Sequence, residues 1–353
     1  MNKKIVWTAI IVGLNCFNIF GQSARKLPTP QPQPEVKTVD SPLPQKKMPP
    51  LNASSSRTAT PVALDTILNE AQKQVENYEQ TFKDLLATET KTFIRYDKNG
   101  NSKDPTIVES DFLVYQSPKD ANVTTELRNV VKVDGKLVPD SQSRSEKFLA
   151  ELQKASTLES ELEKIEKEGA RYDKTLEVYG LTLFEGGVLD EKLRPFFDFK
   201  LLGSENYQGN DLYVISYQQT KASPFVTLNG GTEESRDYGF DFKLEVPGAL
   251  KNSDAFLRGK LWIDKQTYQI RRENRELTVQ ADGQPLVILA NDFNYQPSDY
   301  GILVPKQISV TTNLLKKDKE TDRYQAVKDT TVTFDYSKFR KTNTDVKVLD
   351  DPN

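Results

Sequence analysis

The stretch from Arg258 to Glu273, RGKLWIDKQTYQIRRE, decides the fold of this 353-residue chain. Leu261 and Trp262 take opposite faces of an extended strand, because successive side chains alternate across a β-strand. Asp264 begins a short polar turn, and Tyr268 starts the return strand. The stretch therefore predicts an antiparallel β-hairpin.

Strand patterns continue on both sides of this hairpin, with short polar turns between them. Asp134-Gly135 has the composition of a tight hairpin turn, and Asp97-Lys98-Asn99-Gly100 is a second turn cluster. Because neighbouring strands are joined by short turns, we expect an antiparallel meander rather than a parallel sheet. The predicted strands are 92–96, 106–116, 130–133, 136–138, 212–217, 256–264, 268–279, 286–295, 302–314 and 324–339.

Two stretches have the periodicity of helices. Between Ala63 and Leu86, apolar residues recur at steps of three and four, which places them on one helical face. Residues 143–169 form a second, highly charged stretch, in which Ser156 and Glu159 have the spacing of a capping box and divide it into two helices. The expected class is therefore α+β, with the first helix packed on the sheet that follows it.

The hairpin also carries a family resemblance. Its Gly259-x-x-Trp262-Ile263-Asp264 pattern, followed by a turn and Tyr268, resembles envelope proteins related to the lipoprotein-sorting chaperones of the periplasm, the LolA/LolB-like proteins. The stretch from Asp299 to Pro305 is similar to their next strand, and the resemblance covers about residues 212–339. It implies an antiparallel open half-barrel sheet with covering helices, whose concave apolar side binds acyl chains. It assigns no role to any single residue.

The N-terminus has the pattern of a secretory signal peptide. A basic start precedes an apolar run from Ile5 to Phe20, which is shorter than the about 20 residues of a membrane-spanning helix. We expect a signal peptide over 1–23 with cleavage after Ser23, or alternatively after Gly21. An uncleaved N-terminal anchor is the remaining alternative.

Cys16 is the single cysteine, so the chain cannot form an internal disulfide. The preceding Asn15 does not fit the small residues of a lipid-attachment site, and Cys16 lies inside the apolar run, so we expect it to leave with the signal. The net charge of -3 then loses Lys3 and Lys4 and becomes -5. That balance does not predict nucleic-acid binding.

Residues 24–62 have the composition of a disordered, proline-rich linker. Nine of the 19 prolines lie between Leu27 and Pro61. Since proline fixes φ and has no N–H, the segment is expected to be an extended, solvated tether. The alternative is a polyproline ligand for an envelope protein partner. We expect a single folded domain over 63–340 and a flexible tail over 341–353.

The composition narrows the chemistry that the chain can perform. The chain has no histidine, which excludes Ser–His–Asp and Cys–His catalysis and nearly every zinc, copper or non-haem iron site. It contains no Walker loop, dinucleotide fingerprint, nucleophile elbow or EF-hand. The sequence therefore predicts a protein that is not an enzyme, and assigns no catalytic residue, metal ligand, cofactor or ligand-binding residue.

Several local patterns have both a functional and a structural interpretation. Asp97–Asn101 is similar to part of a calcium loop but lacks the later glutamate, so we prefer a hairpin turn. Trp262 is interpreted as a sheet aromatic in preference to a ligand contact. The aromatic residues at strand spacing indicate a packed face or an apolar groove; they are Tyr213, Tyr217, Phe240 and Phe242. The acidic and glycine pairs fit chance and turns better than a hydrolase or a phosphate site; they are Glu233-Glu234, Asp237 with Asp241, Gly186-Gly187 and Gly230-Gly231.

Together these patterns predict an exported protein of the periplasm or the extracellular face of a bacterial cell envelope. It is expected to hold an apolar ligand, such as the acyl chain of a lipid or lipoprotein, between the sheet and its helices, with no membrane span after signal cleavage. Two alternatives stay open, an envelope protein-interaction module with a filled core and a carboxylate-dependent hydrolase. An internal tunnel favours the carrier, an exposed apolar patch the interaction module, and facing carboxylates in a polar cleft the hydrolase.

Overall fold

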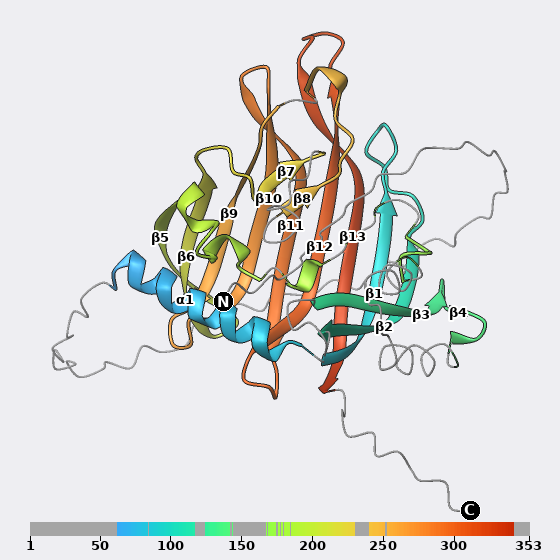
Figure 1. Ribbon diagram of the computed structural model, residues 1–353. Helices are drawn as coiled ribbons and strands as arrows, with labels where there is room; N and C mark the ends of the chain where they lie inside the picture. The colour runs from blue at the N-terminus through green and yellow to red at the C-terminus, as the bar shows by residue number, and fades with distance from the viewer. Residues whose placement is uncertain are drawn as a thin grey trace, which may run out of the picture. The chain divides into compact units, whose positions relative to one another are not determined.

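A large antiparallel sheet organises the folded part of the chain in the computed structural model (Figure 1). The structure describes residues 62–341, with gaps at 84, 117–123, 142, 144–166, 168, 174–175, 177, 179, 184, 230–239 and 251–252. The described residues from Ala63 onward belong to one compact unit. The predicted signal peptide, nearly all of the linker, the tail after Lys341 and most of the helical stretch 143–169 lie outside the described residues.

The large sheet is open. In chain order, its strands are β1 (Leu85–Arg95), β2 (Thr106–Gln116), β3 (Thr124–Val133), β4 (Lys136–Leu137), β5 (Phe197–Tyr207), β6 (Asn210–Gln219), β9 (Ala255–Asp264), β10 (Ile270–Ala281), β11 (Gln284–Pro297), β12 (Leu303–Lys317) and β13 (Tyr324–Lys341). They lie side by side in the order β4-β3-β2-β1-β13-β12-β11-β10-β9-β6-β5, and each pairs antiparallel with its neighbours. β4 and β5 are the two edges and do not pair with each other, which leaves the sheet unclosed.

This architecture confirms the predicted antiparallel open sheet. The strand predictions after residue 210 each fall on an observed strand, because alternating side chains and short turns are local signals. The Asp134-Gly135 turn also forms as predicted, with positive φ at both residues. Of the helices expected to cover the sheet, α1 (Leu64–Thr81) is the one within the described part of the chain.

The predicted first helix was too long. α1 ends at Thr81, and Leu85 and Leu86 belong to β1 instead of the helix. β1 alternates between buried and half-buried residues along nearly its whole length, so leucines that also match a helical step of three or four fit a strand equally well. Tertiary pairing with β13 then favours the strand.

The turn after Trp262 is longer than predicted. The carboxylate of Asp264 accepts hydrogen bonds from the backbone N–H groups of Gln266 and Thr267. Tyr268 has a φ of 58°, a left-handed conformation that does not continue a strand. The prediction that Tyr268 starts the return strand was therefore wrong, and β10 begins at Ile270.

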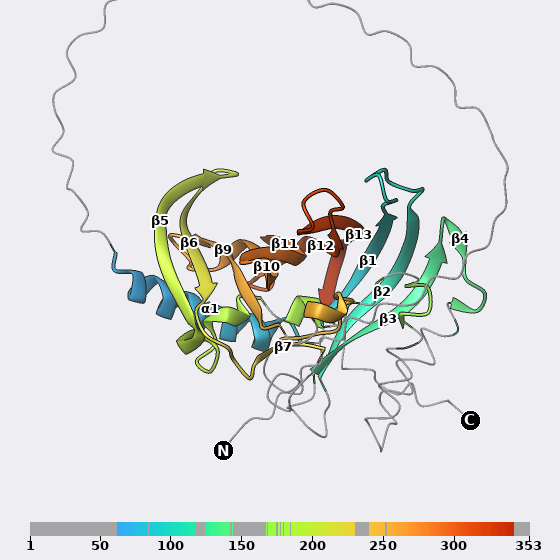
Figure 2. The same cartoon turned by 90° about the horizontal axis from the view of Figure 1, so that it is seen from above.

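One face of the sheet is covered, and we call it the helix-side face. Figure 2 shows the sheet bent around α1 and several short elements. These short elements are the 3-10 helices η1 (Leu181–Leu183), η2 (Gly187–Leu189), η3 (Arg194–Phe196) and η4 (Gly248–Leu250), and the two-stranded parallel sheet of β7 (Val226–Leu228) and β8 (Phe240–Phe242). Among the described helices, none combines the length and the apolar character that crossing a membrane requires.

The core lies between the helix-side face and these covering elements. From the sheet it contains Leu277, Phe293, Ile308, Val310, Val332 and Phe334, and from the cover Ile67, Leu68, Ala71, Leu181, Val188, Leu189, Phe240 and Phe242. Each of these side chains is nearly or completely removed from water. Their burial is the main driving force that holds the cover on the sheet, at about 25 cal/mol per Å² of apolar surface.

Candidate functional site

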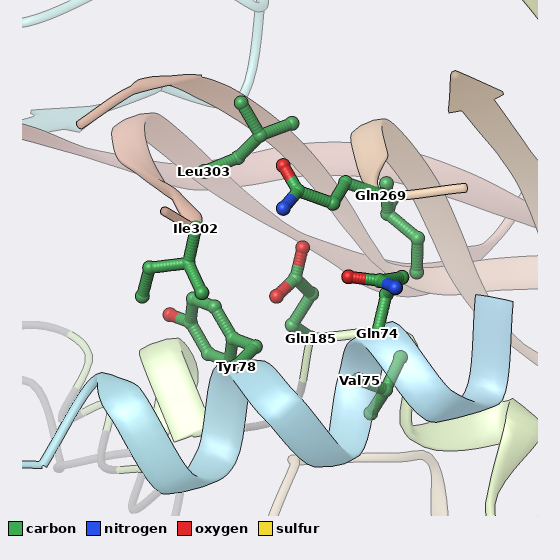
Figure 3. A pocket seen from close by; sticks show the side chains of 8 residues that line it. Gln74, Val75, Tyr78, Glu185, Gln269, Ile302 and Leu303 are labelled. Carbon is green, nitrogen blue, oxygen red and sulfur yellow. The ribbon is translucent and has the colours of Figure 1, made fainter. Parts of the chain in front are cut away.

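A small cavity lies where α1 crosses the lower ends of the central strands (Figure 3). Its volume is about 10 Å³, close to the space that one water molecule needs. It is lined by Gln74, Val75, Tyr78, Glu185, Gln269, Ile270, Ile302 and Leu303. The cavity therefore has apolar walls from both the helix and the sheet, with a few polar groups directed into it.

Glu185 is the acid of this cavity. It sits between η1 and η2, is 5% exposed, and points between Tyr78 and Gln269 in Figure 3. Burial raises the pKa of its carboxyl well above the usual range, and the negative charge of Glu273 raises it further. Glu185 is therefore protonated over part of the pH range in which an exposed glutamate is ionised.

The following Gly186 holds this segment tightly against the sheet. Its φ is 55°, and a Cβ at this position would lie 2.9 Å from a methyl carbon of Val75 and in collision with Ile270. Its N–H donates a 3.3 Å hydrogen bond to Glu273. The Gly186-Gly187 pair thus forms a turn that packs between α1 and β10, as the interpretation of this pair as a turn predicted.

Behind the cavity, Glu273 is the centre of a buried polar cluster. Its carboxylate accepts hydrogen bonds from Arg275 Nε and Nη2, both at 2.9 Å, and from the Tyr217 hydroxyl at 2.8 Å. Arg275 also lies over the rings of Phe240 and Phe293, at 4.7 and 4.8 Å from their centroids. The Arg275 charge is thus directed at Glu273.

A second buried cluster lies on β1 and β3. Arg128 donates hydrogen bonds to Glu89 at 2.8 Å and to Glu126 at 2.9 Å, and Glu126 in turn accepts from the Thr182 backbone and hydroxyl. Burial opposes ionisation of Glu89, but the charges of Arg128 and Lys91 outweigh it and lower the pKa of Glu89. Lys91 pairs with Asp173 at 2.7 Å. These pairs tie the cover to the sheet rather than forming an open cleft.

A larger, open groove of about 580 Å³ runs across β5, β6, β9 and β10. Its charged lining is mixed in sign, with Asp198, Lys200, Arg258, Lys260 and Glu276. Arg258 and Glu276 pair across it at 2.8 Å. Because Leu257 and Leu277 beside them are buried under the cover, alternation places Arg258 and Glu276 on the face opposite α1.

The structure places the residues that the sequence singled out. Asp97 accepts hydrogen bonds from the N–H groups of Asn99 and Asn101 in the turn between β1 and β2, so the hairpin-turn interpretation is confirmed. Trp262 is 8% exposed and donates from Nε1 to Glu205 at 2.8 Å, with Arg272 over its ring. Because Leu261 faces the cover, Trp262 lies on the opposite face and is a sheet aromatic.

The aromatic, acidic and glycine patterns that the sequence singled out do not lie together at one site among the described residues. Tyr217, Phe240 and Phe242 are buried in the core, which confirms a packed face for them, whereas Tyr213 stacks on Tyr268 near the turn. Asp241 accepts a hydrogen bond from Thr227. Three of the patterns lie outside the described residues: Glu233-Glu234, Asp237 and Gly230-Gly231.

Glu185, Glu273 and Arg275 were not singled out from the sequence. Glu185 stands in the irregular stretch before Gly186-Gly187, and nothing in its neighbours distinguishes it from the chain's other acids. For Glu273 a signal existed, because it occupies the inward phase of a strand whose next inward residues are Arg275 and Leu277. A charged residue at a strand position where the alternation calls for a buried apolar side chain indicates a buried ion pair.

Comparison with known proteins finds likeness at the level of fold. Neither family models nor curated protein sequences match the chain. Among solved structures, it is similar to a DUF1329 family protein from Desulfovibrio piger, with 13% identity, 81% of this chain and 95% of that chain covered, and a TM-score of 0.33. An outer membrane lipoprotein-sorting protein domain from Vibrio parahaemolyticus matches with 10% identity, coverage of 78% and 94%, and a TM-score of 0.31.

A LolA superfamily protein from Nitrosomonas europaea matches with 8% identity, coverage of 80% and 95%, and a TM-score of 0.30. Identities this low assign no activity or ligand to the chain. The solved structures matched thus include a lipoprotein-sorting protein domain and a LolA superfamily protein.

Proposed function

We propose that the chain is an exported, non-enzymatic protein of a bacterial cell envelope that holds an apolar ligand, such as an acyl chain, between the helix-side face and its cover. In this proposal residues 1–23 are a signal peptide, 24–62 a proline-rich tether, 63–340 the binding domain and 341–353 a tail. The tether holds the domain away from the surface or partner to which the chain is attached.

The observation that carries the proposal is the cavity under α1. Val75 on the helix faces Ile270, Ile302 and Leu303 on the sheet side across an incompletely filled space. An apolar chain that enters here keeps contact with apolar walls on both sides.

The cavity is too small for an acyl chain in the observed conformation, so binding requires α1 to move. Burial of a twelve-carbon chain contributes about 9 kcal/mol at about 0.8 kcal/mol per methylene. This gain is opposed by the cost of association and of displacing the helix. The covering elements are α1, the short 3-10 helices and the small sheet of β7 and β8, none of which is hydrogen-bonded into the large sheet as a strand. Such a cover can separate from the sheet without breaking its ladders.

Native mass spectrometry of the exported protein, purified without detergent, tests the proposal. We expect the protein to carry extra mass in lipid-sized steps, and we expect organic extraction to remove this mass. Ile302→Gln, which puts an amide into the cavity wall, should abolish uptake while the far-UV circular dichroism spectrum is retained. Leu202→Gln is the matched control, since Leu202 is 54% exposed on β5. A clean ligand-free mass after exposure to envelope lipids would overturn the proposal.

An envelope protein-interaction module is the second candidate, and the β5 edge favours it. Leu201 and Leu202 are exposed on this edge strand, and an unpaired strand edge can accept a strand from another chain. The irregularity of β5 between Leu201 and Gly203 weakens the edge as a template for pairing. The ligand-free mass in the experiment above is the result that would favour this candidate.

A further inference from the structure

The charge environment of the Glu185 cavity selects a kind of ligand. Of the eight residues that line the cavity, Glu185 is the one with an ionisable carboxyl, and none is a lysine or arginine. The described residues donate no hydrogen bond to its carboxylate. The cavity therefore contains a buried acid without a counter-charge of its own.

The groups around Glu185 reinforce this negative character. On α1 the hydroxyl of Tyr78 donates to the Thr182 carbonyl oxygen at 2.8 Å, and Glu79 adds a negative charge nearby. On β10, Glu273 is a second acid, and the Arg275 guanidinium is bonded to it through two nitrogens. The phenol of Tyr295 on β11 interacts with both Glu185 and Glu273, and the phenol of Tyr217 on β6 interacts with Glu273. A cation that enters the cavity is attracted by the carboxylates of Glu273 and Glu79, and by Glu185 once it ionises, and is repelled by the one guanidinium already paired with Glu273.

The size of the cavity and its hydrogen-bond acceptors match one kind of cationic group. A cavity of about 10 Å³ accepts a group the size of a water molecule, which matches a primary ammonium and excludes a guanidinium or a quaternary amine. An ammonium group donates three hydrogen bonds. The acceptors at hand are the two oxygens of the Glu185 carboxylate and the amide oxygen of Gln74, whereas the end of Gln269 nearer to Glu185 in Figure 3 is its amide nitrogen, which donates to the Gly301 carbonyl oxygen. The carbon atoms attached to that ammonium would contact Val75, Ile270 and Ile302.

We propose that this cavity binds the primary ammonium group of an alkyl-chain ligand, with Glu185 as its counter-ion. The inference rests on the proposed function, since the alkyl chain occupies the space between sheet and cover. Protonated Glu185 gives up its proton when the ammonium group binds, so that the neutral carboxyl becomes the anion of an ion pair. The proton passes to the solvent, and binding releases up to one proton per ligand.

Isothermal titration of the mature protein with matched amphiphiles tests the inference. The probes are dodecylamine, dodecan-1-ol and methylamine, each below its aggregation limit. Dodecylamine should bind at least ten-fold more tightly than dodecan-1-ol, methylamine should not bind measurably, and titration in two buffers of different ionisation enthalpy should show proton release. Glu185→Gln should reduce the preference for the amine to less than two-fold while dodecan-1-ol still binds.

Control variants separate the head group from the fold. Glu76→Gln changes an exposed acid on α1 and should leave the amine preference intact. Glu185→Leu provides a second variant without the carboxyl if Glu185→Gln does not fold. Equal binding of the amine and the alcohol, unchanged by either Glu185 variant, overturns the head-group inference and leaves the proposed function standing. Binding of methylamine as tightly as dodecylamine overturns the alkyl part of the inference, and failure of every chain to bind overturns the proposed function with it.

Discussion

The hydroxyl of Tyr217 on β6 donates a 2.8 Å hydrogen bond to Oε1 of Glu273 on β10, although β9 lies between these strands. The residue opposite Tyr217 on β9 is Gly259. A Cβ at Gly259 would lie 2.6 Å from the Tyr217 hydroxyl oxygen and in collision with the carbonyl oxygen of Asn274. The missing side chain is what lets the Tyr217 ring cross the strand and reach the carboxylate.

Gly259→Ala should therefore lower the free energy of unfolding by about 1–3 kcal/mol, the cost of overpacking a filled core. Urea denaturation measures this value. Gly248→Ala is the matched control, because a Cβ there meets no atom within 4 Å, and it should change stability by less than about 0.5 kcal/mol. Equal effects of the two substitutions on stability would show that the position of the Tyr217 ring does not depend on the missing side chain at Gly259.

Arg128 pairs with the buried carboxylates of Glu89 and Glu126, and its removal leaves both without this cation, although Glu126 keeps its hydrogen bonds from Thr182. Arg128→Met should cost about 3–5 kcal/mol in unfolding free energy, the usual result of breaking a buried ion pair. Lys132 forms an equally short pair with Glu109, but both side chains are about one third exposed. Lys132→Met should therefore cost only about 0–1 kcal/mol. Similar losses for the two variants would contradict the buried role of Arg128.

Glu185 should give the protein a stability that falls with rising pH. The unfolded chain loses this proton near the usual value of 4.5, whereas the folded state keeps it because burial and Glu273 raise its pKa. Above 4.5 the folded state thus binds more protons than the unfolded state, so this group lowers the free energy of unfolding as pH rises, until the folded pKa is passed.

Urea denaturation of the wild type and Glu185→Gln at pH 5, 6 and 7 measures this dependence. The wild type should lose up to about 1.4 kcal/mol per pH unit relative to the variant. Glu76→Gln should follow the wild type, since Glu76 is exposed on α1. Parallel curves for the wild type and Glu185→Gln would mean that Glu185 is ionised in the folded protein.

Tyr78 links α1 to η1, another element of the cover, through its hydrogen bond to the Thr182 carbonyl oxygen. Tyr78→Phe keeps the ring stacked on Phe82 but leaves that buried carbonyl without its donor, at a cost of about 1–2 kcal/mol. Amide hydrogen exchange should accelerate in α1 more than in β10 to β12. Tyr300→Phe, which removes a 3.2 Å bond in a half-buried position, should leave exchange in α1 unchanged. Uniform acceleration across the sheet would contradict a local role for Tyr78.

Trp262 should contribute to stability and not to ligand binding, because it lies on the face opposite α1. Trp262→Phe removes the hydrogen bond to Glu205 and weakens the contact with Arg272, which should cost about 1–2 kcal/mol. The affinity for dodecylamine should stay within two-fold of the wild type. A larger loss of affinity in a folded variant would place the ligand on the other face of the sheet.

The strands that the sequence predicted well share a physical property. From β9 to β13 each strand alternates between buried and more exposed side chains over part of its length, and each is joined to the next by a polar turn. Such signals lie within a few residues of one another, so they need no knowledge of the rest of the chain.

β5 was not predicted, for the opposite reason. It is an edge strand exposed along most of its length, with adjacent leucines at an irregularity before Gly203. Without one buried face there is no alternation to detect. Its pairing with β6 stabilises the strand in place of a local pattern.

The antiparallel meander, the helix that precedes it and the exclusion of histidine-dependent chemistry follow from the amino-acid sequence alone, because composition, alternation and turn residues are local properties of the chain. The pairing of β1 with β13 and the position of Glu185 near Glu273 under α1 are seen only in the folded chain. These contacts join residues far apart in the chain, and they form because burying the apolar face brings distant segments together. The charge of a buried acid depends on those neighbours, which no local pattern contains.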